Sequence, residues 1–186
     1  ELDMEIPTSF KNGYLEEIID IFDSQRIPLS GSDRENMKKV YPYYGAASLM
    51  DYVEDYIFDG TYILLGEDGT VITAKGYPIL QYVYGKFWVN NHAHILKGKN
   101  GFDENSLFVL LNNTNISDII TGGVQAKISQ TNLKTVKTTI PPKELLKELN
   151  KKLKSIFDVK IQTLENQKMC FKLKEILLSK MATIKG

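Results

Sequence analysis

Residues 141–186 read PPKELLKELNKKLKSIFDVKIQTLENQKMCFKLKEILLSKMATIKG, and this stretch decides the architecture of the chain. From Lys143 to Ile184 it contains 42 residues with neither Gly nor Pro. Pro141 and Pro142 stand directly before it, where a helix tolerates proline because its first N–H groups have no partner within the helix. We therefore predict a single helix of roughly 60 Å, at about 1.5 Å per residue.

Apolar side chains recur along this stretch at spacings of three and four residues, which is the pattern of one helix face. The apolar positions that we assign to a partner interface are Leu146, Leu149, Leu153, Ile156, Leu164, Phe171, Leu178 and Met181. A domain of about 140 residues cannot cover such a stripe along its whole length, so the helix needs a partner helix. The stripe slips between Ile156 and Phe157 and is interrupted by lysines, which favours an irregular antiparallel pair over a parallel zipper.

A second architecture is compatible with the same residues. The helix could break near residues 158–163, where the β-branched Val159, Ile161 and Thr163 lower helix propensity. Such a break would give two helices folded on each other. The sequence alone leaves both arrangements open.

The composition is that of an ordinary folded protein, with 42% hydrophobic and 25% charged residues among 186. This length allows one compact domain with an appendage. The longest apolar runs are too short to span a membrane, and no leader peptide opens the chain, although Glu1 suggests that the natural start lies upstream. Cys170 is the single cysteine and excludes an internal disulfide, so a cytoplasmic location follows as the default.

Charge is unevenly distributed along the chain, although the formal total is zero. Residues 1–70 carry 15 acidic and 5 basic side chains, residues 71–140 carry 3 and 7, and residues 141–186 carry 5 and 11. A neutral total argues weakly against nucleic acid, but a local basic surface can still bind phosphates. For any single lysine, a solvated surface position is the more ordinary interpretation.

Residues 1–140 are expected to form a mixed α+β domain with small sheets. The expected elements are a short helix leading into a strand within 2–29, an extended segment at 41–45, a hairpin over 62–73 with a tight turn at Gly69, an exposed loop over 75–86, strands at 87–89 and 93–96, and a helix over 104–112 capped by Asp103. We assign Trp88, Val89 and Ile95 to the core of this domain.

No complete catalytic apparatus is present in the sequence. It contains neither a Gly-x-x-x-x-Gly-Lys-Ser/Thr phosphate loop nor a Gly-x-Ser-x-Gly nucleophile elbow. His92 and His94 would share one face of a strand, but two histidines without a cluster of Cys or carboxylate residues are too few for a metal site. We therefore expect a non-catalytic chain that holds no metal.

Two segments carry side chains suited to binding DNA. Residues 75–86 combine lysines, tyrosines and Gln81, and residues 122–127 place Gln125 and Lys127 after paired glycines that permit close backbone approach. Lysine can neutralise phosphates, and Gln can bond to both groups on the edge of an adenine. Each signal alone is weak, because a Tyr-rich loop is as often hydrophobic packing under a flap.

The order of several segments along the chain resembles one half of the specificity subunit of a type I restriction–modification system. These segments are YPYYGAASLMDYV (41–53), YILLGEDGTVI (62–72), GKFWVNNHAHIL (85–96), TGGVQAKISQTNLKTVKTTIPP (121–142) and FKLKEILLSKMATIKG (171–186). Together they span nearly the whole chain, and none of them is a catalytic signature. The resemblance therefore rests on their combination.

The resemblance implies a division into two parts. Residues 1–140 would correspond to one target recognition domain of mixed α/β type, and residues 141–186 to one long helical region for dimerisation, spacing and methyltransferase docking. A full subunit carries two such units, whose helices pack antiparallel as a coiled coil. Since this chain has one of each, it would be either a naturally half-sized subunit or a fragment of a longer one.

The resemblance also implies partners. They would be double-stranded DNA, a methyltransferase subunit and, where one exists, a restriction subunit; the chain itself would hold no cofactor. S-adenosylmethionine for adenine N6 methylation would belong to the methyltransferase subunit, and ATP and Mg²⁺ to the motor-nuclease subunit. A homodimer around a two-fold axis would read an interrupted palindrome. The alternative is a protein–protein adaptor whose helix dimerises or docks on an assembly, which the acidic first 70 residues favour.

Within such a domain we predict which side chains lie near DNA. They are Tyr44, Lys75, Tyr77, Gln81, Lys86, Gln125 and Lys127. Replacing Lys86 or Lys127 should weaken binding broadly and flatten its salt dependence, whereas replacing Gln81 should alter which sequence is preferred.

Overall fold

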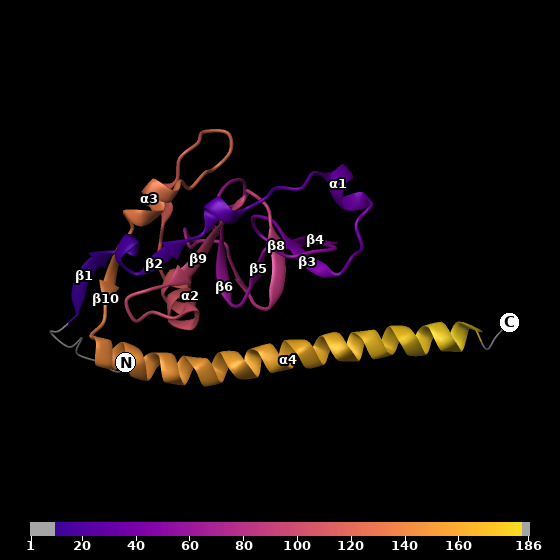
Figure 1. Ribbon diagram of the computed structural model, residues 1–186. Helices are drawn as coiled ribbons and strands as arrows, with labels where there is room; N and C mark the ends of the chain where they lie inside the picture. The colour runs from indigo at the N-terminus through magenta and orange to yellow at the C-terminus, as the bar shows by residue number, and fades with distance from the viewer. Residues whose placement is uncertain (1–9, 184–186) are drawn as a thin grey trace.

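The computed structural model of the protein describes residues 10–183 and contains three small sheets and one long helix (Figure 1). The strands are β1 (Lys11–Tyr14), β2 (Ile19–Ile21), β3 (Tyr41–Tyr44), β4 (Leu49–Val53), β5 (Phe58–Asp59), β6 (Tyr62–Gly66), β7 (Leu80–Val83), β8 (Lys86–Val89), β9 (Ala93–Gly98) and β10 (Lys137–Ile140). The helices are α1 (Gly31–Glu35), α2 (Glu104–Asn112), α3 (Gln130–Lys134) and α4 (Lys143–Thr183), with 3-10 turns at Leu15–Glu17, Asp23–Gln25 and Ser117–Ile119. The expected mixed α+β class with small sheets and a long C-terminal helix is confirmed.

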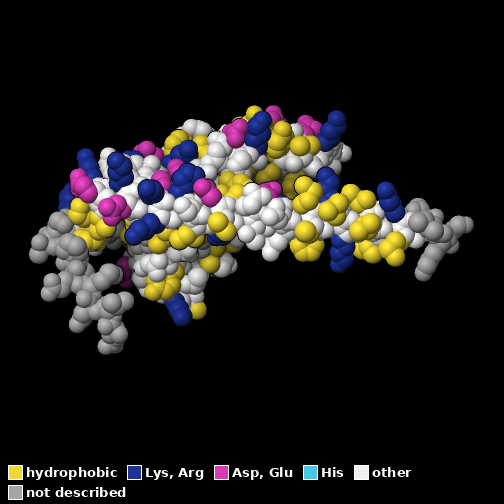
Figure 2. Space-filling model, turned by 90° about the horizontal axis from the view of Figure 1, so that it is seen from below, with side chains coloured by type: hydrophobic (Ala, Val, Ile, Leu, Met, Phe, Trp, Pro, Cys, Tyr) yellow, Lys and Arg dark blue, Asp and Glu magenta, His cyan; other side chains and the backbone are white. Residues whose placement is uncertain are grey.

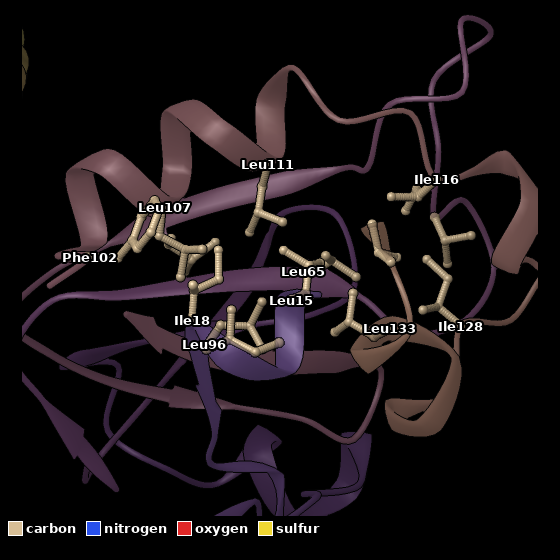
Figure 3. Packing of buried hydrophobic residues seen from close by; sticks show 14 of the residues in the cluster. Leu15, Ile18, Leu65, Leu96, Phe102, Leu107, Leu111, Ile116, Ile128 and Leu133 are labelled. Carbon is tan, nitrogen blue, oxygen red and sulfur yellow. The ribbon is translucent and has the colours of Figure 1, made fainter. Parts of the chain in front are cut away.

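The main sheet has the strand order β2-β9-β6-β7, and all its pairs are antiparallel. Helix α2 packs on this sheet, and Figure 3 shows Leu107 and Leu111 of α2 pointing toward Leu65 and Leu96 of the strands. Asp103 caps α2 because its carboxylate accepts a hydrogen bond from the Ser106 N–H, as the sequence predicts. These elements form the larger of the two cores.

The second sheet has the order β4-β3-β8-β5, with β3 and β8 parallel. An aromatic group fills the space between the two sheets: the rings of Phe58 and Phe87 stack at 5.3 Å, and Tyr62 meets both edge-on. Val89 and Ile95 are fully buried, as expected. Trp88 is only half-buried, and its indole N–H donates to the Ile27 carbonyl at 2.6 Å, so its assignment to the core was wrong.

The expected hairpin over residues 62–73 is wrong. Strand β6 pairs with β7 and β9, and residues 75–86, expected as an exposed loop, contain β7. The reason is that Gly69 turns the chain toward residues 121–127, since its N–H donates to the Ala126 carbonyl at 3.0 Å. A second small turn, closed by the bridge between Ile72 and Pro78, then returns the chain to the sheet.

The first part of the chain also differs from expectation. Instead of a helix leading into a strand, β1 is followed by a single 3-10 turn and then by β2. Strand β1 pairs with β10, which brings the beginning and the end of the domain together just before α4. Residues 2–9 of the expected segment lie outside the described residues.

Helix α4 is continuous over 41 residues, so the long-helix prediction is confirmed and a break near residues 158–163 is wrong. It lies along the domain as far as Glu165 and Lys168, which contact Tyr84, and its last part extends past the domain (Figure 1). Leu146 is buried in the larger core, and the Phe157 ring packs 4.7 Å from Tyr82 and 5.9 Å from Phe108. Tertiary packing thus outweighs the low helix propensity of the β-branched residues. Across residues 10–183, no helix is both long enough and apolar enough to cross a bilayer.

Candidate nucleic-acid interface

Residues 121–127 form a hairpin loop on the side of the molecule opposite α4, where the chain before α3 projects outward (Figure 1). Thr121 and Lys127 close the loop with two backbone hydrogen bonds, of 2.9 and 2.7 Å. The loop is joined to the main sheet because the Ile128 N–H donates to the Glu67 carbonyl at 2.8 Å. The structure therefore places two of the predicted DNA-binding residues, Gln125 and Lys127, together on one exposed projection.

A network of charged and polar side chains lies under this hairpin. His94 Nδ1 lies 2.6 Å from Asp23 Oδ2, and Gln130 Nε2 donates to the same oxygen at 2.7 Å. Arg26 bonds to Glu67 at 2.6 Å and lies 3.6 Å from Asp23. These contacts tie the turn after β2 to β9 and to the segment that leads into α3, so they fix the base of the hairpin.

The hydrogen bonds of His94 hold both of its ring nitrogens. Its Nε2 lies 2.8 Å from the Ile128 carbonyl, which can only accept, so Nε2 carries a hydrogen. Its Nδ1 faces the Asp23 carboxyl group. Burial by itself would raise the pKa of Asp23, but the hydrogen bond and charge of His94, the Ile95 N–H and the nearby Arg26 hold this pKa below its usual value.

The same cluster has the spacing of a cation site, because ligand atoms of Asp23, Glu67 and His94 lie within 4.8 Å of one another. Arg26 and, at 3.6 Å from Glu67, Lys127 already neutralise these carboxylates. We therefore interpret the cluster as a structural network. Sequence reasoning missed it because its members lie far apart in the chain and become neighbours only through the strand order.

The two histidines do not share one strand face as expected. His92 lies in the turn before β9 and is exposed, with its Nδ1 2.7 Å from Asp68 Oδ1, whereas His94 is buried. The turn breaks the alternation on which that expectation depends. Glu67 and Asp68, next to the hairpin, are thus both paired with basic groups.

The other DNA-binding candidates lie on separate elements. Gln81 on β7 donates to the Gly45 carbonyl at 2.9 Å, so its amide holds the loop after β3. Lys75 is exposed at the small turn after β6, and Tyr77 beside it is half-buried. The structure does not bring these residues into one cluster with Gln125.

Tyr44 and Lys86 both belong to the second sheet. Tyr44 is half-buried with its ring 5.9 Å from Phe87, and burial raises its pKa although the charge of Lys168 on α4 acts against the shift. Lys86 is exposed, with its Nζ 4.4 Å from the centre of the Tyr56 ring. Tyr44 is thus close to α4, away from the hairpin.

Helix α4 presents a second surface of a different kind. Of the predicted interface residues, Leu146 is 1% exposed within the core of its own chain and Leu153 is half-buried, so Leu146 cannot face a partner as expected. The remaining predicted positions are exposed: Leu149, Ile156, Leu164, Phe171, Leu178 and Met181. Beyond residue 168 the apolar surface continues on other sides of the helix, at Met169, Leu173, Ile176 and Leu177, and Figure 2 shows it at the end of α4 that leads to the C-terminus.

The chain is thus a small α+β domain with an exposed projecting loop on one side and a partly uncovered long helix on the other. The chain belongs to the family of type I restriction modification DNA specificity domains, whose model matches residues 7–169. The expectation of a specificity chain, as opposed to an enzyme, is thereby confirmed.

A curated relative is the putative type I restriction enzyme specificity subunit S.HindORF215P of Haemophilus influenzae, with 34% identity over 142 residues. The match covers 76% of this chain and 36% of the relative, so the chain spans about a third of that protein. The S subunit of the type I restriction–modification system from M. genitalium has the same fold, with a TM-score of 0.64 at 14% identity over 89% of this chain and 43% of that one. A chain from a structure describing assembly of a type I R-M system gives 0.58 at 13% identity, over 88% and 42%.

Proposed function

We propose that this chain is the DNA-recognition component of a type I restriction–modification complex and carries one recognition domain and one helix. The domain reads one half of a split target, and the helix joins it to a second unit. Methyl transfer to adenine N6 and any cleavage belong to partner subunits, with S-adenosylmethionine, ATP and Mg²⁺ held there. The complex acts in the cytoplasm, where its DNA substrate lies.

The observation that carries this proposal is the uncovered apolar surface of α4. A helix that is apolar on several sides is normally buried, yet Phe171, Leu177 and Met181 are each more than 60% exposed. The domain does not cover them, because α4 extends past it beyond the contact of Lys168 with the Tyr84 ring. Their burial needs another chain.

We propose that a second copy supplies part of this cover, with the two α4 helices antiparallel. The second half of one helix would lie against the outward edge of the other, where Leu149 and Ile156 are exposed. Two identical domains related by a two-fold axis read identical half-sites, so the target would be an interrupted palindrome. The methyltransferase subunit would dock on the remaining apolar sides of the helix.

Two measurements test the proposal. Light scattering of the purified chain should give twice the 21.1 kDa monomer mass. Coexpression with the methyltransferase subunit of the same source should place methyladenine at one interrupted palindrome in the host DNA. A monomer, or an asymmetric methylated target, would contradict the homodimer; no methylation and no duplex binding would favour a protein–protein adaptor.

A further inference from the structure

The hairpin over residues 121–127 combines a fixed base with an uncovered tip. Its base is held by the Thr121–Lys127 pair and by the bond from the Gly69 N–H to the Ala126 carbonyl. Ile128, which follows it, is fully buried, and its carbonyl lies 2.8 Å from His94 Nε2. The tip is therefore a projection from a rigid support.

The shape of the tip depends on Gly122. Its φ of 92° lies in the left-handed region, and a Cβ there would collide with the Gln125 carbonyl. Gly123 has nothing near the position of a Cβ, so the backbone on this side of the tip is open to an approaching surface. A ligand can therefore reach the loop closely.

Val124 occupies this tip and is fully exposed, at 107% of its reference area. No packing within the described residues accounts for an apolar side chain there, and a serine or asparagine would suit an exposed turn better. It is followed in the chain by Gln125, and Lys127, whose ammonium lies 3.6 Å from Glu67 Oε1, closes the hairpin. Of the acidic neighbours, Glu67 is paired with Arg26, and Asp68 Oδ1 lies 2.7 Å from His92 Nδ1.

We propose that Val124 reads sequence by apolar contact with the 5-methyl group of a thymine in the major groove. This proposal rests on the proposed function of the domain. It adds which side chain touches the DNA, Val124, and which base it recognises, thymine. A two-stranded projection fits the major groove, where the thymine methyl separates T from C. Gln125 would contact a neighbouring base edge, and Lys127 a phosphate.

The test begins with selection of the preferred duplex from a random library by the full chain with its methyltransferase subunit. Each thymine of that duplex is then replaced in turn by uracil, which removes only the methyl group. At one thymine, uracil should weaken binding of the wild-type chain by about fourfold, the value of one buried methyl group. The Val124→Ala variant should bind the thymine duplex more weakly and be indifferent to uracil there.

A matched control is Val159→Ala, which truncates an equally apolar, exposed valine on α4. It should keep the full response to uracil. If every uracil duplex binds the wild-type chain as well as thymine does, or if Val124→Ala retains the response, the role of Val124 is overturned while selective binding still supports the proposed function. If the wild-type complex selects no sequence, both fail.

Discussion

The two halves of α4 have similar sequences and opposite surroundings. In the half that lies on the domain, Leu146 and Phe157 are 1% and 6% exposed, whereas in the projecting half Phe171 and Leu177 are 67% and 61% exposed. Both halves are helical without interruption. An isolated helix in water gains little stability from propensity, so the projecting half depends on cover that the chain itself does not provide.

The apolar stripe of α4 therefore has two roles, attachment to its own domain and contact with other chains. One edge of the stripe fixes the helix to its domain, and the rest is available to other chains. A change at a position buried against the domain, such as Leu146 or Phe157, should act on folding of the single chain. A change at an exposed apolar position, such as Phe171 or Leu178, should act on assembly.

The largest expected effect comes from placing charge in the projecting half. Phe171→Asp combined with Leu178→Asp should weaken self-association by at least about 1,000-fold, because the dimer loses two apolar side chains from each copy and each of the four contributes at least about 1 kcal/mol to binding. Light scattering across a concentration series should then give the monomer mass of 21.1 kDa. Lys151→Asp, which changes the charge at an exposed position on the side of the helix opposite Leu149 and Ile156, is the control and should leave the mass unchanged. An unaltered mass in the double variant would mean that the helices associate elsewhere.

The next effect is on folding. Phe157→Ala removes a buried ring that packs against Tyr82 and Phe108, and it should lower the free energy of unfolding by about 3–5 kcal/mol. Phe171→Ala deletes the same side chain from the same helix where it is 67% exposed. Unfolding is followed in urea at a concentration that keeps both variants monomeric. The free energy of unfolding of Phe171→Ala should then differ little from that of the wild type. Equal losses would contradict the division of α4 into two halves.

The sequence predicted the length of α4 because helix periodicity is a local property. It did not separate the two halves, because which edge of the stripe the domain covers depends on the position of α2 and β7. Leu146 illustrates the point: its spacing fits a partner interface, but the end of β10 and the Pro141–Pro142 turn bring it into the domain core. The same limit explains the incorrect hairpin at Gly69, whose partner lies more than 50 residues further along the chain.

A third variant changes the domain at a position away from α4, and it tests whether stability can be lowered without affecting self-association. Asp23→Asn should lower the free energy of unfolding by about 2–3 kcal/mol, because it removes a buried charged hydrogen bond to His94. Self-association should be unaffected. Since the pKa of Asp23 is lowered on folding, its contribution is complete above the unfolded value of about 3.9 and is lost as the pH falls through the folded value.

The pH dependence provides the check on this assignment. The difference in unfolding free energy between wild type and Asp23→Asn should shrink as the pH falls below about 4. Chemical denaturation at each pH measures it. A difference that does not shrink below about pH 4 would contradict an ionised Asp23.

The candidate DNA-binding residues were harder to predict than the helix. Gln125 and Lys127 were placed on an open loop because of the Gly-Gly pair before them, and the structure exposes both, but their contact with DNA stays a prediction. Gln81 was assigned to an exposed loop, yet its amide bonds to the Gly45 carbonyl from within a strand. Replacing it should therefore disturb the loop after β3 as well as any contact with DNA. Composition identifies polar side chains, but only the strand order determines which of them are left without a hydrogen bond inside the domain and can contact DNA.

The smallest expected effect comes from a change near the middle of α4, where the helix leaves the domain. The Tyr84 hydroxyl donates to Glu165 Oε1 at 2.7 Å, and Lys168 bonds to the same oxygen at 2.8 Å. Lys168 and, second, Tyr84 lower the pKa of Glu165, so Tyr84→Phe should raise this pKa toward its ordinary value in an NMR titration.

Because Glu165 is about half exposed, the same change should cost only about 0.2–1 kcal/mol of unfolding free energy. Tyr52→Phe is the control, since no hydrogen bond to its hydroxyl is present among residues 10–183. A loss above about 2 kcal/mol for Tyr84→Phe would show that this polar contact, and not the Phe157 ring, holds the helix on the domain. The domain-bound half of α4 would then extend to Lys168 by a bond that a partner subunit could break.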